Sequence, residues 1–382
     1  MFVAVLSMRD DDGQTLDHTP WISHADRDSS ELPETRLVAN PQTGETTNRV
    51  GSNGKPTYVG KEVCRECHAE NFQLHRVHGH AHTFHDANSE HIAKHYDGKS
   101  YDHGAYGEYK YSSNDDQLSA TLPNRFGDQA FPLQFALGSG HNGITLLSLM
   151  SDENNETVAF EHRVSWFHED DRLGPTPGQR DEPPKSPGDL FGQRHVGNVM
   201  RKCVYCHTTT GEIVDQEIVN LTPNVNCEKC HGPGSEHVHQ ARTMKTPPPF
   251  SVGEATWDAE SEIQLCGDCH RLPTNVSRKE LREYPDSLTR FQPIGMLRSE
   301  CFLSSPGEFK CTTCHNPHET LSKMTTQQYV DRCVECHLED SESHVACPVS
   351  PKTGCIECHM PPVRLEEARA SFHDHWIRVR EE

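Results

Sequence analysis

Seven copies of one five-residue motif, Cys-x-x-Cys-His, contain most of the cysteines in this chain. In such a motif two thiols can add to the vinyl groups of a haem, and the histidine becomes the proximal ligand of the iron. Composition alone would produce about 0.05 such motifs in a chain of this length. The repeat therefore predicts seven covalently bound haem c groups. In chain order, motifs 1 to 7 span residues 64–68, 203–207, 227–231, 266–270, 311–315, 333–337 and 355–359.

The residues that would hold these groups follow directly from the motifs. The thiols are those of Cys64, Cys67, Cys203, Cys206, Cys227, Cys230, Cys266, Cys269, Cys311, Cys314, Cys333, Cys336, Cys355 and Cys358. The proximal histidines are His68, His207, His231, His270, His315, His337 and His359.

Zinc sites, disulfides and iron–sulfur clusters are the alternative uses of these cysteines. Paired Cys-x-x-Cys knuckles also build tetrahedral zinc sites, and an even number of cysteines permits a disulfide framework. Neither use requires a histidine directly after every second cysteine. Iron–sulfur clusters need thiolate quartets at other spacings. The motifs therefore favour haem, and zinc remains the main alternative.

The low hydrophobic fraction of the chain is explained if the protein binds haem. The chain has 382 residues, enough for one large or two ordinary domains, but only 33% are hydrophobic. Such a fraction alone would suggest disorder. Buried porphyrins would supply the missing apolar surface, so we expect the protein without haem to fold poorly.

The charge and the apolar pattern restrict partners and location. A net charge of −21 argues against nucleic acid or anionic membranes as partners and favours basic redox partner proteins. No apolar run reaches 18 residues, so we expect no transmembrane segment. Haem is attached to this motif outside the cytoplasm. We therefore expect a periplasmic or extracellular protein, although the first residues do not resemble a signal peptide.

The hydrophobic pattern divides the chain into segments. Tyr109 and Tyr111, and later the alternate residues 158–166, recur with period two and predict antiparallel strands with one wet face. Helices are expected from Lys61 to about Val77 and from Thr325 into Cys336, the latter capped by Thr325 or Thr326. The expected segments are 1–55 (polar N-terminal tail), 56–104 (first haem-binding helix and His-rich segment), 105–172 (small antiparallel β region), 173–194 (Pro/Gly-rich loop) and 195–382 (six-haem domain).

These segments predict the fold class. We expect a mainly α-helical and irregular multihaem cytochrome fold, wound around a stack of haems, with a small antiparallel β insertion.

Distal ligands are expected to be histidines. Of the 27 histidines seven belong to the motifs, which leaves 20 against eight methionines, so bis-histidine ligation is expected. His318 lies three residues after His315, and the chain between them spans at most about 10 Å, so it would serve a neighbouring haem. The same holds for His237, six residues after His231. Further expected ligands are His80, His195 and His375, with weaker expectations for His78, His141 and His344.

Other cysteines and histidines remain outside this scheme. Cys301 and Cys347 belong to no motif, and an oxidising compartment predicts a disulfide between them. The surplus histidines of residues 75–103 are interpreted as surface residues or an adventitious metal site.

Several stretches resemble a known family. They are Tyr58-Val-Gly-Lys-Glu-Val-Cys64, Leu137-Gly-Ser-Gly140, 227–237, Cys301-Phe, 311–318, 355–361 and Asp374-His375-Trp-Ile. Together they are similar to heptahaem cytochromes related to the tetrahaem partner of hydroxylamine oxidoreductase, over about residues 56–380. The resemblance implies that His237 and His318 are distal ligands. The chain departs from this family in its extra histidines at 75–103 and in having no eighth motif.

The motifs favour an electron carrier over a catalyst. The predicted function is electron transfer along covalently bound, mostly bis-histidine haems. One alternative is an oxidoreductase in which one open-site haem acts on a small nitrogen or sulfur compound. Another is a subunit of a larger redox complex, docked through the 105–170 sheet.

Overall fold

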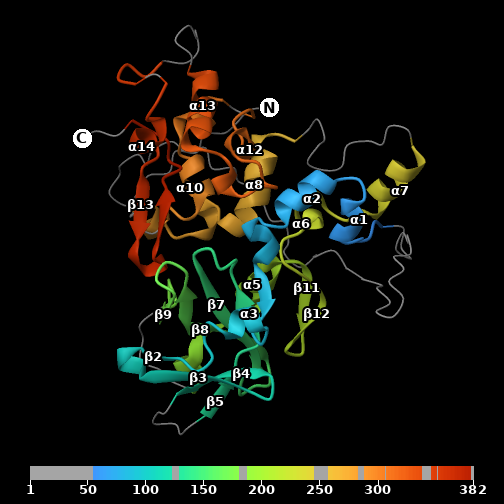
Figure 1. The fold of residues 1–382 in the computed structure, drawn as a ribbon, viewed down its shortest axis with the longest axis vertical. Coiled ribbons are helices and arrows are strands. Elements are labelled where there is room, and N and C mark those ends of the chain that lie inside the picture. The colour runs from blue at the N-terminus through green and yellow to red at the C-terminus, as the bar shows by residue number, and fades with distance from the viewer. Residues whose placement is uncertain are drawn as a thin grey trace.

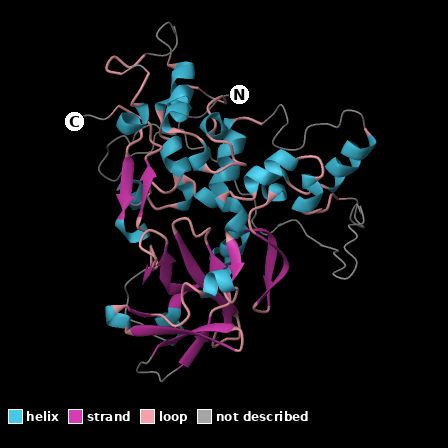
Figure 2. Ribbon diagram, viewed as in Figure 1, coloured by secondary structure: helices cyan, strands magenta, loops and turns pink. Residues whose placement is uncertain are grey.

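Strands gather at one end of the molecule and helices at the other (Figures 1 and 2). The computed structural model describes residues 55–122, 129–179, 187–244, 257–282, 288–305, 307–337, 346–350 and 352–379. The predicted tail, apart from residue 55, and His344 lie outside these ranges.

The predicted fold class is wrong. Helices make up 38% of the described residues and strands 27%, arranged in several antiparallel sheets. Strand structure is more extensive than the expected insertion because segments on both sides of it join the sheets, and because two hairpins form within the haem-rich part. The protein is a mixed fold of helices and antiparallel sheets.

The larger sheet has six strands in the order β1-β6-β7-β8-β10, with β9 also paired to β8. All of its pairings are antiparallel. Its strands are β1 (Phe84–Asp86), β6 (Phe135–Leu137), β7 (Gly143–Ser151), β8 (Thr157–Phe167), β9 (Arg172–Pro175) and β10 (Gly192–His195). The chain between β6 and β7 turns at Gly138, where φ is +112° and a Cβ atom would lie 2.6 Å from the Gly143 carbonyl oxygen. Glycine is required at that position.

A second sheet has four strands in the order β2-β3-β4-β5. They are β2 (Ser100–Asp102), β3 (Glu108–Asn114), β4 (Gln117–Leu122) and β5 (Gln129–Pro132). Tyr109 and Tyr111 on β3 are buried, and the adjacent Glu108 and Lys110 are exposed, so the predicted alternation is confirmed for this strand. The two sheets enclose the main apolar core.

The prediction of one wet face is wrong for β8. Val158, Ala159, Phe160 and residues 162–167 are all buried, and not only the alternate ones. The reason is that β8 lies between β7 and β10 inside the larger sheet, and both of its faces are covered. One face packs into the main core, and Ala159 on the other packs into a second cluster with Met200.

His162 on β8 joins the two sheets. Its Nδ1 lies 2.7 Å from the Phe191 carbonyl oxygen and its Nε2 lies 2.8 Å from the Tyr111 hydroxyl oxygen. The side chain is 1% exposed, and burial lowers its pKa to about 4. His162 is therefore a neutral structural residue of the core.

The helical part contains most of the motifs. Its helices are α1 (Lys61–Arg65), α2 (Ala69–His75), α5 (Gly197–His207), α6 (Cys227–His231), α7 (Ser235–Thr243), α8 (Ala259–His270), α9 (Arg278–Arg282), α10 (Gln292–Met296), α11 (Glu300–Ser304), α12 (Cys311–Cys314), α13 (Thr326–Cys336) and α14 (Cys355–His359). The short helices α3 (Glu90–Ala93) and α4 (Pro187–Phe191) lie beside the sheets. Two hairpins complete the fold: β11 (Thr208–Val214) with β12 (Glu217–Pro223), and β13 (Pro362–Leu365) with β14 (Ala370–His373).

The two predicted helices had different outcomes. Helix α13 begins after Thr325, whose hydroxyl accepts a hydrogen bond from the Gln328 N–H at 3.3 Å while the Gln328 side chain accepts one from the Thr325 N–H at 2.8 Å. This capping box confirms the predicted start. The helix expected from Lys61 to about Val77 is instead divided into α1 and α2, and motif 1 spans the break.

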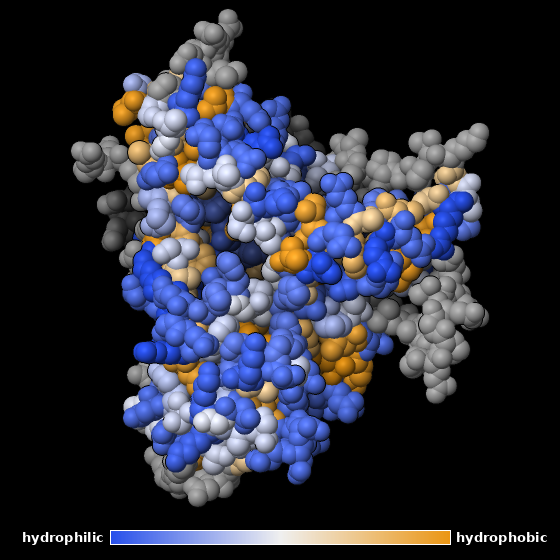
Figure 3. All heavy atoms as spheres, viewed as in Figure 1, coloured by the Kyte–Doolittle hydropathy of each residue, from blue (hydrophilic) through white to orange (hydrophobic). Residues whose placement is uncertain are grey.

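The visible surface is mostly hydrophilic (Figure 3). This agrees with the high charge of the sequence. Within the described ranges, no helix combines the length and the apolar character needed to cross a membrane.

Candidate haem-binding site

The motifs lie on short helical turns. Motifs 3 and 7 are themselves the helices α6 and α14, motifs 2 and 4 end α5 and α8, motif 5 begins on α12, and motif 6 closes α13. Residues three apart on a helix share a face, so each turn presents its two thiols to the same side. The histidine follows at the end of the turn. The donor set therefore fits one covalently attached haem at each motif.

Thiols of different motifs lie close together. Cys64 of motif 1 hydrogen-bonds Cys227 of motif 3. The same contact joins motif 2 to motif 4, motif 4 to motif 5, and motif 6 to motif 7, through the pairs Cys206–Cys269, Cys266–Cys311 and Cys333–Cys355. These pairs form three groups, motifs 1 and 3, motifs 2, 4 and 5, and motifs 6 and 7, and several neighbours in space are not neighbours in sequence.

Four motif histidines face a second histidine from another part of the chain. The ring centroids are 6.2 Å apart for His68–His237, His231–His318 and His315–His375, and 6.1 Å apart for His80–His270. Two imidazoles on opposite sides of one metal ion, each bound at about 2.0–2.1 Å, would have centroids about 6.3 Å apart. The four pairs therefore fit a single iron between their rings.

The distance alone does not identify a ligand pair. His75 and His78 also lie 6.1 Å apart, yet neither belongs to a motif. What distinguishes the four pairs is that each contains one motif histidine. Their second members are four of the five distal ligands predicted from sequence: His80, His237, His318 and His375.

Hydrogen bonds orient a distal and a proximal histidine for ligation. The Nδ1 atoms of His375 and His207 lie 2.9 Å and 3.0 Å from the carbonyl oxygens of His373 and Thr83. A ring that donates Nδ1–H to a carbonyl keeps its Nε2 lone pair for a metal. Desolvation, with the nearby His78 and His270, lowers the pKa of His80 to about 3, so this ring is neutral as a ligand must be.

His195, the fifth predicted distal ligand, does not face a motif histidine. Its Nε2 lies 3.2 Å from a carboxylate oxygen of Glu161. In the described part of the chain, the motif histidines His207 and His359 do not stack against another histidine ring; each directs Nδ1 to a carbonyl oxygen. Motifs 2 and 7 therefore differ from the four motifs with a facing histidine.

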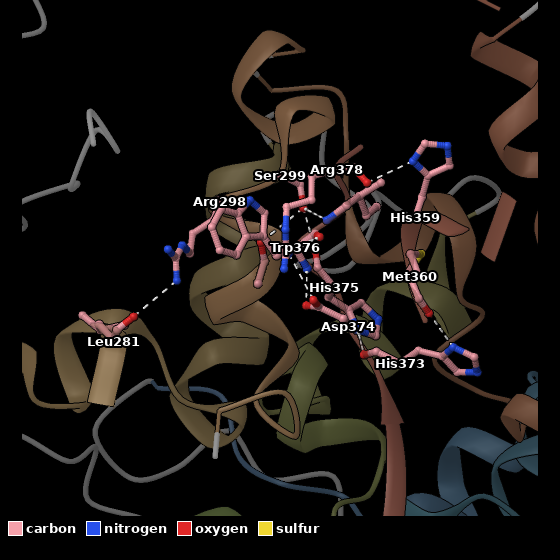
Figure 4. Close-up of polar contacts among 12 residues, drawn as sticks. Leu281, Arg298, Ser299, His359, Met360, His373, Asp374, His375, Trp376 and Arg378 are labelled. Carbon is pink, nitrogen blue, oxygen red and sulfur yellow. Dashed lines mark hydrogen bonds and ion pairs between the residues drawn. The ribbon is translucent and has the colours of Figure 1, made fainter. Parts of the chain in front are cut away.

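The C-terminal segment positions two of the rings (Figure 4). The Ser299 hydroxyl donates to the His375 carbonyl oxygen at 2.6 Å and accepts from the Ile377 N–H at 2.8 Å. In the next residue, the Arg378 carbonyl oxygen lies 3.0 Å from Nδ1 of His359. The short segment after β14 thus places His375 against motif 5 and supports the histidine of motif 7.

The same segment is fixed by charge. Asp374 is fully buried and pairs with Arg378 at 3.1 Å. The guanidinium groups of Arg298 and Arg378 each lie 3.8 Å from the Trp376 ring centroid. Trp376 is therefore held by two cations, which stiffens the segment that carries His375.

Residues between the cysteines join three motifs. The ammonium group of Lys229 in motif 3 lies 3.5 Å from the ring centroid of Tyr205 in motif 2. The Tyr205 hydroxyl lies 3.4 Å from a carboxylate oxygen of Asp268 in motif 4. These side chains form a junction among motifs 2, 3 and 4, which the sequence analysis missed because the two residues between the cysteines vary freely in the motif.

Two buried glutamates, also missed, anchor the motifs. Glu228 accepts backbone hydrogen bonds at 2.8 Å from Val59, Gly60 and Gly234. Glu262 accepts from the Thr312 N–H at 2.8 Å and from its hydroxyl at 2.9 Å, which ties α8 to motif 5. Their burial is the signal of this role, and it cannot be seen in the sequence.

The predicted disulfide between Cys301 and Cys347 is wrong, because both are free thiols. Cys301 lies on α11, where Cys336 and Glu300 act electrostatically on it and burial raises its pKa. Cys347 lies near Cys355 of motif 7 and accepts a hydrogen bond from the Ser350 N–H. The two thiols thus face different motifs.

A comparison with protein families supports the cofactor. Residues 306–342, which include motifs 5 and 6, match the family described as "Doubled CXXCH motif". The match indicates a multihaem c-type cytochrome. Among solved structures, the chain is similar to the Outer Cell Wall Cytochrome OcwA, with a TM-score of 0.48 and 14% identity over 84% of this chain and 79% of that one. No curated protein sequence matches the chain.

Proposed function

We propose that this chain is an exported heptahaem c-type cytochrome that carries electrons between redox partner proteins in the periplasm or at the cell surface. Each bound haem supplies a one-electron couple through its iron. The chain's part is to attach the haems through the motif cysteines, to ligate them through histidines and to hold them close together. With a net charge of −21, the favoured partners present basic surfaces.

The facing histidine rings carry this proposal. His237, His318, His80 and His375 are the proposed distal ligands of motifs 1, 3, 4 and 5, in that order, at ring separations of 6.1–6.2 Å. Bis-histidine ligation leaves an iron without a position for substrate, which suits a carrier better than a catalyst.

The contacts between motifs support a continuous path. Thiol contacts join motif 1 to 3, 4 to 5 and 6 to 7. Cys230 of motif 3 lies within electrostatic range of both cysteines of motif 4, and Cys314 of motif 5 within range of Cys336 of motif 6. The proposed order is therefore 1-3-4-5-6-7, and motif 2 branches from motif 4.

Two measurements on the purified full chain test this function. Intact mass under denaturing conditions should show seven covalent haems, and magnetic resonance of the oxidised protein should show low-spin iron at motifs 1, 3, 4 and 5. A mass equal to that of the polypeptide, or zinc in place of iron, would refute the proposal. High-spin iron at any of those four motifs would refute the ligand assignment.

A second candidate function is catalysis at motif 2. Its histidine faces no second histidine ring in the described residues, and Glu161 acts electrostatically on both Cys203 and His207. Glu161 also contacts His195 and acts on Arg290, whose Nε is buried without a hydrogen-bond partner. A carboxylate, an imidazole and a cation near motif 2 are groups that could bind a small nitrogen or sulfur compound and supply protons to it if the haem of this motif had an open site.

Ligand binding separates the two candidates. If motif 2 is open, cyanide should convert one high-spin haem to low spin, and Arg290→Met should weaken that binding while leaving the low-spin haems unchanged. If all seven irons are low spin and inert to cyanide, only electron transfer remains.

A further inference from the structure

The surplus histidines of residues 75–103 form the wall of a cavity. It is lined by His82, His85, His91, Lys94 and His95, and also by Trp166, His168 and Asp171. Its volume is about 710 Å³. None of these histidines belongs to the four ring pairs proposed for haem, so the cavity needs another explanation.

Two of the rings approach each other closely through their nitrogen atoms. His91 Nε2 lies 3.1 Å from His85 Nδ1, and the ring planes are 75° apart. Two nitrogens bound to one metal ion at about 2.0–2.1 Å, with an angle between 90° and 110°, are about 2.9–3.4 Å apart. The observed separation falls inside that interval.

A hydrogen bond sets the tautomer of the His85 ring. His85 Nε2 lies 2.7 Å from the His82 carbonyl oxygen, to which it donates its proton. Its Nδ1 then carries the lone pair, directed at His91. A carbonyl that accepts from the outer nitrogen is the usual support of a metal-bound imidazole. For a metal ion to bind, the proton that His91 now donates from Nε2 moves to its Nδ1, so that His91 Nε2 and His85 Nδ1 both offer lone pairs.

We propose that His85 and His91 chelate a divalent transition metal ion of the zinc and copper class, with water completing its coordination. Imidazole nitrogens suit these ions, whereas magnesium and calcium require oxygen ligands. The carboxylate of Asp171 in the same cavity is engaged by the Trp166 indole N–H at 2.7 Å. No three histidine, cysteine or acidic side chains of the described residues converge on one point, so the two imidazoles are the protein ligands.

The site is next to motif 2 but separate from it. Thr83, between His82 and β1, donates its hydroxyl proton to the His207 carbonyl oxygen at 2.8 Å. The chelating pair therefore lies on the segment that supports a proximal histidine, and the haem ligands themselves are other residues. Metal content at this site and haem content can consequently be measured independently.

Zinc titration of the haem-loaded full chain tests the proposal. After treatment with a chelator, the protein is dialysed against micromolar zinc, and bound zinc and iron are counted by elemental analysis. We expect one zinc per chain beyond the iron, with affinity reduced by more than about tenfold in His85→Gln and in His91→Gln, because even changes outside the ligand shell cost 10–100-fold. His239→Gln, at an exposed position on α7, is the matched control and should bind as the wild type does. Zinc binding unchanged in the two variants would overturn the proposal.

Copper(II) provides a second readout that does not depend on the variants folding. The magnetic resonance spectrum of copper bound to the oxidised wild-type protein should show hyperfine coupling to two imidazole nitrogens. Coupling to none, or to more than two, would contradict a two-histidine site.

Discussion

Replacing Glu228 with glutamine should release the segment before motif 1 from motif 3. Glu228 is 4% exposed, and its two oxygens accept three backbone N–H groups at 2.8 Å. Oε1 accepts from Val59 and Gly234, and Oε2 accepts from Gly60. The carboxylate thus links motif 3 to residues 59–60 before motif 1 and to Gly234 after motif 3.

The magnitude follows from these contacts. In Glu228→Gln the amide oxygen can keep the two donors at the Oε1 position, but the NH₂ group then meets the Gly60 N–H, donor against donor. One hydrogen bond to a charged acceptor is lost, a buried donor is left unsatisfied, and the other two bonds lose the charge. Such losses together cost about 2–4 kcal/mol.

Amide hydrogen exchange measures this cost locally, which suits a protein whose global unfolding is complicated by covalent cofactors. Exchange of residues 57–60 should accelerate by about 30- to 1,000-fold, because each 1.4 kcal/mol is a factor of ten. Glu357→Gln in motif 7, where the side chain is exposed, is the control and should leave residues 57–60 unchanged. Equal protection in Glu228→Gln and wild type would refute the reasoning.

Three further predictions concern the iron of motif 3, the junction among motifs 2, 3 and 4, and the two cysteines outside the motifs. His318→Ala should convert the iron of motif 3 to high spin in magnetic resonance spectra, whereas His239→Ala, at an exposed position on α7, should leave all signals unchanged. Lys229→Met should lower the midpoint potential of haems around the junction in spectroelectrochemical titration, because a nearby cation favours the reduced state, and Lys229→Arg should retain the wild-type value. Without reductant, the denatured protein should take up two alkyl groups, at Cys301 and Cys347; uptake of none would restore the disulfide.

Local features were predictable from the sequence where the signal itself is local. The start of α13 was found because threonine is a common N-cap residue and Thr325 stands directly before the helix. The alternation in β3 was found because one of its faces is exposed. In β8 the same periodicity was misleading, because burial of both faces depends on which strands lie on either side.

The surroundings of the motifs depended on the tertiary fold. Each motif is a local pattern, but its facing histidine comes from elsewhere: His237 follows motif 3 and faces motif 1, and His318 follows motif 5 and faces motif 3. Chain length excluded ligation of the preceding haem by His318 but could not select the neighbour that it would serve. The error over Cys301 and Cys347 has the same origin, because neither an oxidising compartment nor an even number of cysteines determines the distance between two thiols.

These long-range pairs also bear on how the haems would be held in place relative to one another. Because His237 is proposed to ligate across motifs 1 and 3, His318 across 3 and 5, and His80 across 1 and 4, each iron would bridge segments that are distant in sequence. The same ligands that would set low potentials would therefore also fix the spacing between haems. A thiol contact also places motifs 1 and 3 side by side, so for this pair the attachment points and the facing ring favour one arrangement. Loss of one distal histidine should therefore disturb two neighbouring motifs, and a change of spin state confined to one iron would show that the motifs are positioned by the polypeptide alone.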